Sequence, residues 1–308
     1  MLPTRLPFHF APCAWAQSSM IHAGARPVFC DIDDAYTIDP QDARSRITKR
    51  TVGILPVHLY GRPANLDALQ KIADDHGLWI IEDCAQAHGA KWKGKRVGSI
   101  APHAAFSFYP SKNLTVYGDG GAIATSSDEY AERVRMLRNH GRKDKYLHEK
   151  IGFNLRFNEI QAAIGREQLK VLDSLNSQRR QAAERYRQEL ADVPGVVLPP
   201  ADEDGQIESV YHLFVIRLPD AETQHGLAES LRSRGIETGV HYPVPNHLQP
   251  AIIDKYGPQP WLPRTEQYVN RILSLPMFPG ISPRQIKTVA AAVRGYLATS
   301  KPMASSIG

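Results

Sequence analysis

Lys112 is the residue of this chain whose surroundings first suggest chemistry. It stands in a polar turn, residues 109–113 (YPSKN), which directly follows a hydrophobic run at residues 104–108. A lysine that points to water is ordinary, but an ammonium group held in a desolvated cleft tends to lose its proton. The free amine can then form a Schiff base with a carbonyl compound or with pyridoxal phosphate (PLP). Spacing alone leaves two alternatives open, a solvated loop lysine and a reactive amine.

Asp83, at the end of a predicted strand, is a second candidate. Residues 78–81 (LWII) predict a buried strand that ends in Glu82 and Asp83. In an open α/β sheet the ligand crevice lies beyond the carboxyl ends of the strands, so Asp83 would face it. A buried carboxylate needs a cation or hydrogen-bond donors to stay charged, and a protonated pyridine nitrogen is the cation that PLP offers. The same residue could instead cap a following helix.

Strands and helices alternate through the first part of the chain. The pattern predicts strands at residues 26–31, 51–58 and 78–83, and helices at residues 39–47 and 65–76. Repeated strand–helix–strand units favour a mostly parallel sheet flanked by helices. A long helix over residues 159–191 leads to a smaller region. We therefore expect an α/β fold with a large domain, residues 1–175, and a small C-terminal α/β domain, residues 176–308.

The composition argues against several classes of protein. The 308 residues are 42% hydrophobic and 22% charged, as in globular proteins. The net charge of +5 is mild and no dense basic block is interleaved with aromatic residues, so nucleic acid is not an expected partner. No run of about 18 apolar residues and no signal-like start occur, which predicts no membrane span and a cytoplasmic location. Three cysteines without CxxC spacing indicate a reducing compartment and no structural metal site.

Three motifs follow one another in the first half of the chain. They are EDCAQAHGA (residues 82–90), FSFYPSKN (106–113) and GDGGA (118–122), and further stretches such as GFNLRFNEIQAAIG (152–165) accompany them. In this order and at these distances they resemble the DegT/DnrJ/EryC1/StrS family of PLP-dependent sugar aminotransferases. The resemblance runs from about Ala23 to about Arg294, and the motifs are specific only when taken together. It implies the aspartate-aminotransferase fold (fold type I) and PLP as the cofactor.

The resemblance also implies a role for individual residues of these motifs. Lys112 would be the catalytic residue that carries PLP, and Asp83 would keep the pyridine nitrogen of the cofactor protonated. Gln86, three residues after Asp83, would lie beside the phenolic oxygen, where its amide can donate a hydrogen bond. Ser107 would hydrogen-bond the cofactor phosphate.

Asn154 matches an asparagine that family members extend to the phosphate of the neighbouring subunit's cofactor. The resemblance therefore implies a homodimer with shared active sites. The residues alone also allow a simpler role, in which Asn154 caps the helix that starts near Asn158. His241 and Tyr242 match a pair that lies near the substrate entrance in the family, so we expect them to contact the substrate.

The first 22 residues fit the family pattern poorly. Family members begin some tens of residues earlier, and that earlier part contains a Gly-Thr-type turn at a helix N-terminus that helps to hold the cofactor phosphate. This sequence has no such turn, so we expect a chain that is short at its N-terminus, with activity that depends on this segment. Phe10 and Trp15 are both candidates for the aromatic side chain that stacks on the cofactor ring, and each would serve equally as a core residue.

The resemblance implies an aminotransferase that moves an amino group from glutamate or glutamine to a nucleotide-linked keto sugar, in amino-sugar, surface-polysaccharide or antibiotic-sugar biosynthesis. The alternative is a non-catalytic or truncated paralogue with a binding or regulatory role. The missing turn favours this alternative, whereas Lys112 and Asp83 oppose it. A PLP-dependent sugar dehydratase is disfavoured, because those relatives carry histidine at the position of the lysine.

Overall fold

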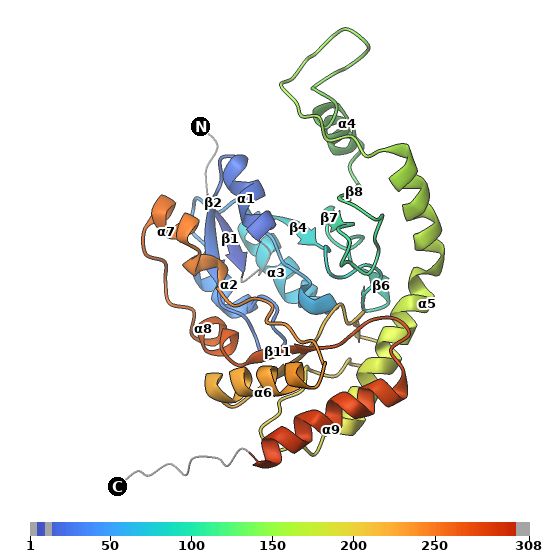
Figure 1. Cartoon of the computed structure of the whole chain (residues 1–308). Coiled ribbons are helices and arrows are strands. Elements are labelled where there is room, and N and C mark those ends of the chain that lie inside the picture. The colour runs from blue at the N-terminus through green and yellow to red at the C-terminus, as the bar shows by residue number, and fades with distance from the viewer. Residues whose placement is uncertain (1–4, 10–13, 300–308) are drawn as a thin grey trace.

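A four-stranded sheet in the first half of the chain carries Asp83 at the end of one strand, and Lys112 lies in the turn that follows another (Figure 1). The structure, a computed structural model, describes residues 5–9 and 14–299, with side chains from residue 17 onward. The strands lie in the order β3 (Gly53–Ile54), β4 (Trp79–Asp83), β7 (His103–Ser107) and β8 (Gly121–Thr125). β3, β4 and β7 are parallel, and β8 runs antiparallel to β7. Because β4 and β7 are parallel, their last residues reach the same edge of the sheet.

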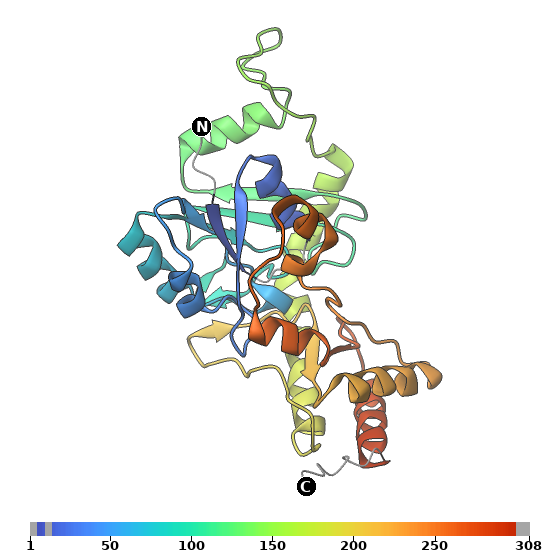
Figure 2. The same ribbon diagram turned by 90° about the vertical axis from the view of Figure 1, so that its left-hand side faces the viewer.

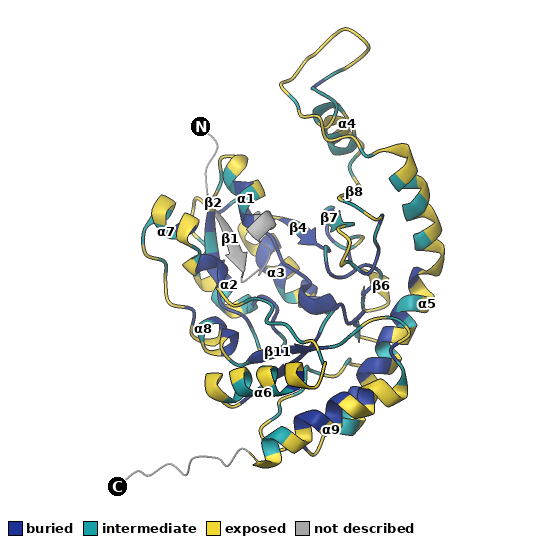
Figure 3. Ribbon diagram, viewed as in Figure 1, coloured by how far each residue is buried: buried dark blue, intermediate teal, exposed yellow. Residues whose placement is uncertain are grey.

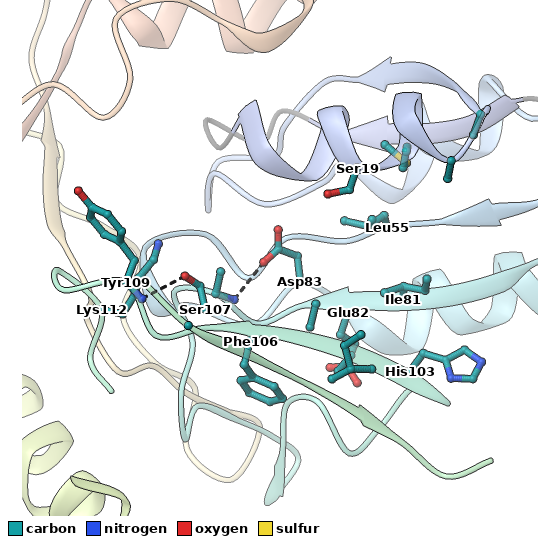
Figure 4. Close-up of a pocket in the computed structure, with 18 of the residues that line it drawn as sticks. Ser19, Leu55, Ile81, Glu82, Asp83, His103, Phe106, Ser107, Tyr109 and Lys112 are labelled. Carbon is teal, nitrogen blue, oxygen red and sulfur yellow. Dashed lines mark hydrogen bonds between the residues drawn. The ribbon is translucent and has the colours of Figure 1, made fainter. Parts of the chain in front are cut away.

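Helices cover both faces of this sheet. α1 (Ala14–His22) lies over the face that carries Asp83 (Figure 4). α2 (Pro40–Ser45) and α3 (Leu66–His76) pack on the opposite face, against Ile54 and Ile80. A further parallel pair, β1 (Arg5–His9) and β2 (Arg26–Cys30), lies beside β3.

The helix α3 shows how the local sequence determines where a helix begins and ends and which face it buries. The side chain of Asn65 accepts a hydrogen bond from the backbone N–H of Ala68 at its start, and Gly77 ends it in the left-handed conformation, with φ 64°. Its buried residues Leu69 and Ile72 lie on one face, as the spacing predicts. The strand expected over residues 51–58 is reduced to β3, because Pro56 has no N–H for the ladder.

One 32-residue helix, α5 (Glu159–Leu190), runs along both halves of the molecule (Figures 1 and 2). Its last turns pack against an antiparallel pair, β10 (Phe214–Arg217) and β11 (Ile272–Leu275), together with α6 (Ala221–Ser233) and α9 (Pro283–Thr299). The expected division at residue 175 falls inside α5 and stays a prediction. Across residues 5–9 and 14–299, no helix combines the length and the apolar character that crossing a membrane requires.

Short elements complete the described chain. They are η1 (Leu59–Gly61), β5 (Lys91–Trp92), β6 (Lys95–Arg96), α4 (Asp128–Leu137), β9 (Ile207–Glu208), η2 (Asn246–Leu248), α7 (Pro250–Tyr256) and α8 (Pro263–Val269). α4 contains no buried residue, and the loop that follows it extends away from the body of the molecule (Figures 1 and 3).

Glu82 anchors β4 from the face opposite to Asp83. Its fully buried carboxylate accepts hydrogen bonds from four donors: His58 Nε2 (3.0 Å) and the backbone N–H groups of Gly98 (2.9 Å), Ile100 (3.2 Å) and Ala101 (2.7 Å). Nδ1 of His58 accepts from the N–H of Ala64, so its Nε2 must carry the proton that it shares with Glu82. The carboxylate therefore joins β4 to the turn before β7 and to the segment before η1.

The pKa of Glu82 reflects this environment. Burial alone would raise it, but the hydrogen bonds from His58 and the backbone outweigh burial and hold the pKa below its usual value. The carboxylate thus stabilises the fold above the pKa of an ordinary glutamate, and this stability is lost as pH falls through the lowered pKa. Cys84 lies nearby, but the polar atoms of His58 and Glu82 are engaged with protein donors and acceptors, so we assign this cluster a structural role.

Replacing Glu82 by Gln tests this anchor. All four partners donate, so the amide NH2 of a Gln would face N–H groups and leave buried donors without an acceptor. We expect Glu82→Gln to lower the free energy of unfolding by about 3 kcal/mol, measured by urea denaturation. Glu132→Gln, at an exposed position of α4, is the matched control and should change it by less than about 0.5 kcal/mol. Equal stability of the two variants would contradict the assignment.

Candidate active site

A cavity of about 1270 Å³ opens at the C-terminal ends of β4 and β7. Its lining includes Asp83, Ser107, Lys112 and Tyr242, which come from four separate segments of the chain. α1 forms the facing wall, and Ser19 of this helix points toward Asp83 (Figure 4). Crevices beyond the carboxyl ends of parallel strands are where α/β sheets bind ligands. The structure therefore places these four predicted site residues around one binding space.

Asp83 lies on the cavity face of β4 because successive side chains of a strand alternate between faces. It is only 8% exposed, and its Oδ1 accepts a hydrogen bond from the backbone N–H of Ala85 at 3.0 Å. Burial raises the pKa of this carboxyl, while the Ala85 bond and the nearby Lys112 lower it in part. Residues 84–90 form turns, so the alternative that Asp83 caps a following helix is wrong.

Lys112 lies in the cavity wall, half-buried, in a turn that its N–H closes on the carbonyl of Tyr109. Its charge acts on three histidines near it. Burial lowers the pKa of His88 to about 4, with Lys112 as the second cause. The pKa of His212 lies well below its usual value, and that of His241 is also lowered, from the same two leading causes. These imidazoles are therefore neutral near pH 7.

Asn113 fixes the lysine turn from behind, a contact that the sequence analysis missed. Its Nδ2 donates to Asn176 Oδ1 and to the carbonyl of Val210, both at 3.1 Å. A carbonyl can only accept, so the amide orientation is fixed and Oδ1 must accept from Nδ1 of His212 at 3.0 Å. Asn176 Nδ2 donates in turn to the carbonyl of His88. This buried network ties the turn to α5 and to the segment before β10.

Gln86 is buried, and its amide orientation is also fixed by a backbone group. Its Oε1 accepts from the N–H of Tyr60 at 2.8 Å, so Nε2 points the other way and donates to the hydroxyl of Tyr242 at 3.4 Å. Tyr242 lines the cavity, whereas Gln86 is not among the lining residues and directs its donor to the cavity wall through Tyr242. Ser107 faces the same space, and its Oγ accepts from the N–H of Tyr109 at 3.3 Å (Figure 4).

The other predicted site residues lie elsewhere. His241 turns its Nδ1 to Ser274 Oγ at 2.8 Å and is not among the residues that line the cavity. Asn154 is exposed, away from the cavity of its own chain. It does not cap α5, because the N-cap is Asn158, whose side chain accepts from the N–H of Gln161.

Two further candidates fall outside the structural description. Phe10 lies outside the described residues, and for Trp15 only the backbone, within α1, is described. Which of the two stacks on a cofactor therefore stays a prediction.

The cavity has a polar end and an apolar end. Asp83, Ser107 and Lys112 form the polar end, whereas the part over the sheet is lined largely by apolar side chains, namely Val52, Leu55, Trp79, Ile81 and Ile123. His103 lies beside Ile81 in this part (Figure 4). Trp79 and Ile123 are 39% and 53% exposed. A ligand with charged groups would therefore be recognised at the edge of the sheet, beside the lysine turn.

Comparison with known proteins gives the family. The sequence model of the DegT/DnrJ/EryC1/StrS aminotransferase family matches residues 11–294. The chain belongs to this family. A curated relative, the dTDP-3-amino-3,4,6-trideoxy-alpha-D-glucose transaminase of Streptomyces venezuelae, is 46% identical over a stretch that covers 94% of this chain and 75% of that protein.

Solved structures of the DegT family agree with this assignment. DesV of S. venezuelae, in complex with a ketimine intermediate, superposes with a TM-score of 0.92 at 43% identity, over 97% of this chain and 80% of DesV. NtdA of Bacillus subtilis, with bound cofactor PMP, superposes with a TM-score of 0.87 at 31% identity, over 96% of this chain and 68% of NtdA. The predicted fold class, the PLP-dependent transferase fold, is thereby confirmed.

The side chains at the polar end fit the cofactor of this family. Asp83 is a buried carboxylate whose pKa is raised, so a protonated ring nitrogen would stabilise its charged form. Lys112 offers an amine, Ser107 a hydroxyl for a phosphate, and Gln86 an amide donor directed at Tyr242 in the cavity wall. These are the groups that hold PLP in proteins.

Replacing Asp83 by Asn should stabilise the protein when no cofactor is bound. Asn keeps an acceptor for Ala85 and carries no charge. Because the folded pKa of Asp83 is raised, its favourable contribution is complete only below the unfolded value near 3.8 and is lost as pH rises through the folded pKa. We expect Asp83→Asn to raise the thermal unfolding midpoint by a few degrees at pH 8, with a smaller gain at pH 5.

Differential scanning fluorimetry of cofactor-free protein at both pH values checks this expectation. Asp254→Asn, at an exposed position of α7, is the control and should shift the midpoint by no more than about one degree. An Asp83→Asn midpoint at or below wild type at pH 8 would show that the buried carboxylate does not destabilise the fold.

Proposed function

We propose that this protein is a PLP-dependent aminotransferase that transfers the amino group of glutamate or glutamine to a nucleotide-linked keto sugar. The observation that carries the proposal is the shared cavity of Lys112 and Asp83, an amine and a buried carboxylate, at the strand ends of a family member. The substrate class is supported by the named activity of the Streptomyces venezuelae relative, a dTDP-amino-sugar transaminase. The reaction would take place in the cytoplasm, where amino-acid donors are available.

Each residue at the polar end has a task in this proposal. PLP, when bound, supplies an electron sink that makes the proton on the substrate Cα removable. Lys112 holds the cofactor and then, as a free amine, moves that proton away from Cα as a general base. Asp83 keeps the ring nitrogen protonated. Ser107 donates to the phosphate and Gln86 to the phenolic oxygen, so both orient the ring against Lys112.

The three histidines near Lys112 are neutral at neutral pH. His88, His212 and His241 all have lowered pKa values, with burial as the leading cause and Lys112 among the others. They therefore add no positive charge near the amine at neutral pH. Proton transfer from Cα is general-base work, and it requires the free amine of Lys112.

We propose further that the enzyme is a homodimer with shared sites. Asn154 lies on an exposed segment, and its large apolar neighbours are accessible to solvent in the single chain. Ile151 is 99% exposed, Leu155 68% and Ile160 76%. Several large exposed apolar side chains in one segment favour a contact with another protein surface, and a second copy is the commonest partner. Across such an interface Asn154 of one subunit would reach the cofactor phosphate of the other.

The spectrum of Lys112→Ala tests the cofactor and the lysine together. We expect the wild-type chain, incubated with PLP and dialysed, to retain a visible absorption band that glutamate bleaches. Lys112→Ala should lose the band and all turnover, because no other amine occupies its place. Lys95→Ala, on the exposed hairpin of β5 and β6, should keep both. Retention of the band without turnover in wild type would favour the non-catalytic alternative.

A mixed dimer tests the shared site. Co-expression of Lys112→Ala with Asn154→Ala produces heterodimers in which one of the two sites has both native residues. Random pairing should then restore about a quarter of wild-type activity per subunit, while each variant alone is nearly inactive. Activity no greater than the mean of the two separate variants would show that Asn154 serves no site in a partner subunit.

A further inference from the structure

Tyr60, in the short helix η1, uses each of its polar groups to hold a different segment at the site. Its N–H donates to Oε1 of Gln86 at 2.8 Å, and its carbonyl accepts from the N–H of Leu213 at 3.4 Å. Its hydroxyl donates to the carbonyl of His241, which is 181 residues away in the chain. One residue therefore links the turn after β4, the segment before β10 and the segment that carries Tyr242.

The backbone of Tyr60 is held in an unfavourable conformation to do this. Its φ is 57° and its ψ 11°, in the left-handed region that non-glycine residues rarely adopt. The next residue, Gly61, has φ 92°, and a Cβ there would lie 2.8 Å from the backbone nitrogen of His212. Such a conformation persists only where surrounding contacts determine it, and residues of this kind cluster at functional sites.

The side chain of Tyr60 is equally constrained. The residue is 6% exposed, and its ring packs edge-on against Tyr36 at 5.5 Å between centroids. Burial raises the pKa of the Tyr60 hydroxyl well above its usual value, so the group stays protonated and remains a donor to His241. A buried hydroxyl with one fixed acceptor acts as a rigid tether on the backbone of residue 241.

These contacts define the geometry between Gln86 and Tyr242. The N–H of Tyr60 fixes which end of the Gln86 amide points to the hydroxyl of Tyr242. The hydroxyl of Tyr60 fixes the carbonyl of His241, directly before Tyr242 in the chain. Both partners of the Gln86–Tyr242 hydrogen bond at the cavity wall are thus located by the same residue.

We propose that Tyr60 is a positioning residue that keeps Tyr242 in the cavity wall opposite Gln86, and that it thereby sets the affinity of the site for the keto-sugar substrate. The effect on substrate rests on the function proposed above, whereas the effect on the position of Tyr242 is a property of the protein alone. Tyr60 contacts no reacting group. Its influence passes through Tyr242.

Tyr60→Phe isolates the tether, because it removes one oxygen and keeps the backbone bond to Gln86. In cofactor-free protein, tetranitromethane nitration mapped by mass spectrometry reports the exposure of the Tyr242 ring. We expect nitration of Tyr242 to be about five- to tenfold faster in Tyr60→Phe than in wild type, since the variant loses one of the hydrogen bonds that restrain the segment. Tyr36→Phe, the same change on the neighbouring buried ring, is the matched control and should leave the rate within about twofold.

Kinetics then test the consequence for substrate. Tyr60→Phe should raise KM for the keto sugar about five- to tenfold, with kcat and the half-reaction with glutamate little changed. The double variant Tyr60→Phe/Tyr242→Phe should match Tyr242→Phe alone, because a tether that acts through Tyr242 has no effect once its hydroxyl is gone. If Tyr60→Phe raised KM by the same factor in the Tyr242→Phe background as in wild type, Tyr60 would have only a general packing role.

The two proposals fail in different ways. Unchanged nitration of Tyr242 in Tyr60→Phe overturns the positioning role, whatever reaction the enzyme catalyses. A wild-type protein that neither retains PLP nor transaminates overturns the proposed function, while the nitration result still decides the role of Tyr60.

Discussion

Two neighbouring carboxylates with opposite environments determine how this site is built. β4 turns Glu82 to one face of the sheet and Asp83 to the other, as any strand does. Glu82 accepts from four donors and its pKa falls, so it stabilises the fold by itself. Asp83 has one backbone donor in the cavity and its pKa rises, so its charge needs a further partner. The first carboxylate holds the strand end in place, and this rigidity lets the second remain incompletely satisfied where a ligand can reach it.

The second half of the chain positions the site although it contributes little to the cavity lining. The lysine turn is held by Asn113, whose partners Asn176 and His212 lie on α5 and before β10. Arg179, one turn further along α5, is buried and donates to the carbonyls of Tyr211, His212 and Met277, so it secures the same segment. Backbone carbonyls fix the amide orientations, which leaves each side chain one arrangement. Displacement of α5 would therefore be passed to the lysine turn through the hydrogen bond between Asn176 and Asn113.

The sequence predicted the elements and the strand-end residues because both follow from local rules. Alternating apolar runs located β4, and the rule that ligands meet the carboxyl ends of strands singled out Asp83. The residue type of Lys112 suggested its chemistry, and the family resemblance pointed to Ser107. Asn113 and Tyr60 could not be found this way, because their partners lie 63 and 181 residues away. The left-handed backbone of Tyr60 was equally hidden, since tyrosine does not favour it and only tertiary contacts impose it.

The histidines around Lys112 show why a buried site of this kind tolerates so many titratable groups. An imidazole near a lysine would carry an unfavourable second positive charge, and burial makes that charge more costly still. The fold resolves this by keeping His212 neutral and using its Nδ1–H as a donor to Asn113. The neutral ring thus donates a structural hydrogen bond and adds no charge near Lys112 and Asp83. A ligand with both a cationic nitrogen and an anionic group would be complementary to Asp83 and Lys112 at this edge of the sheet. The neutral imidazoles pack nearby and add no competing charge.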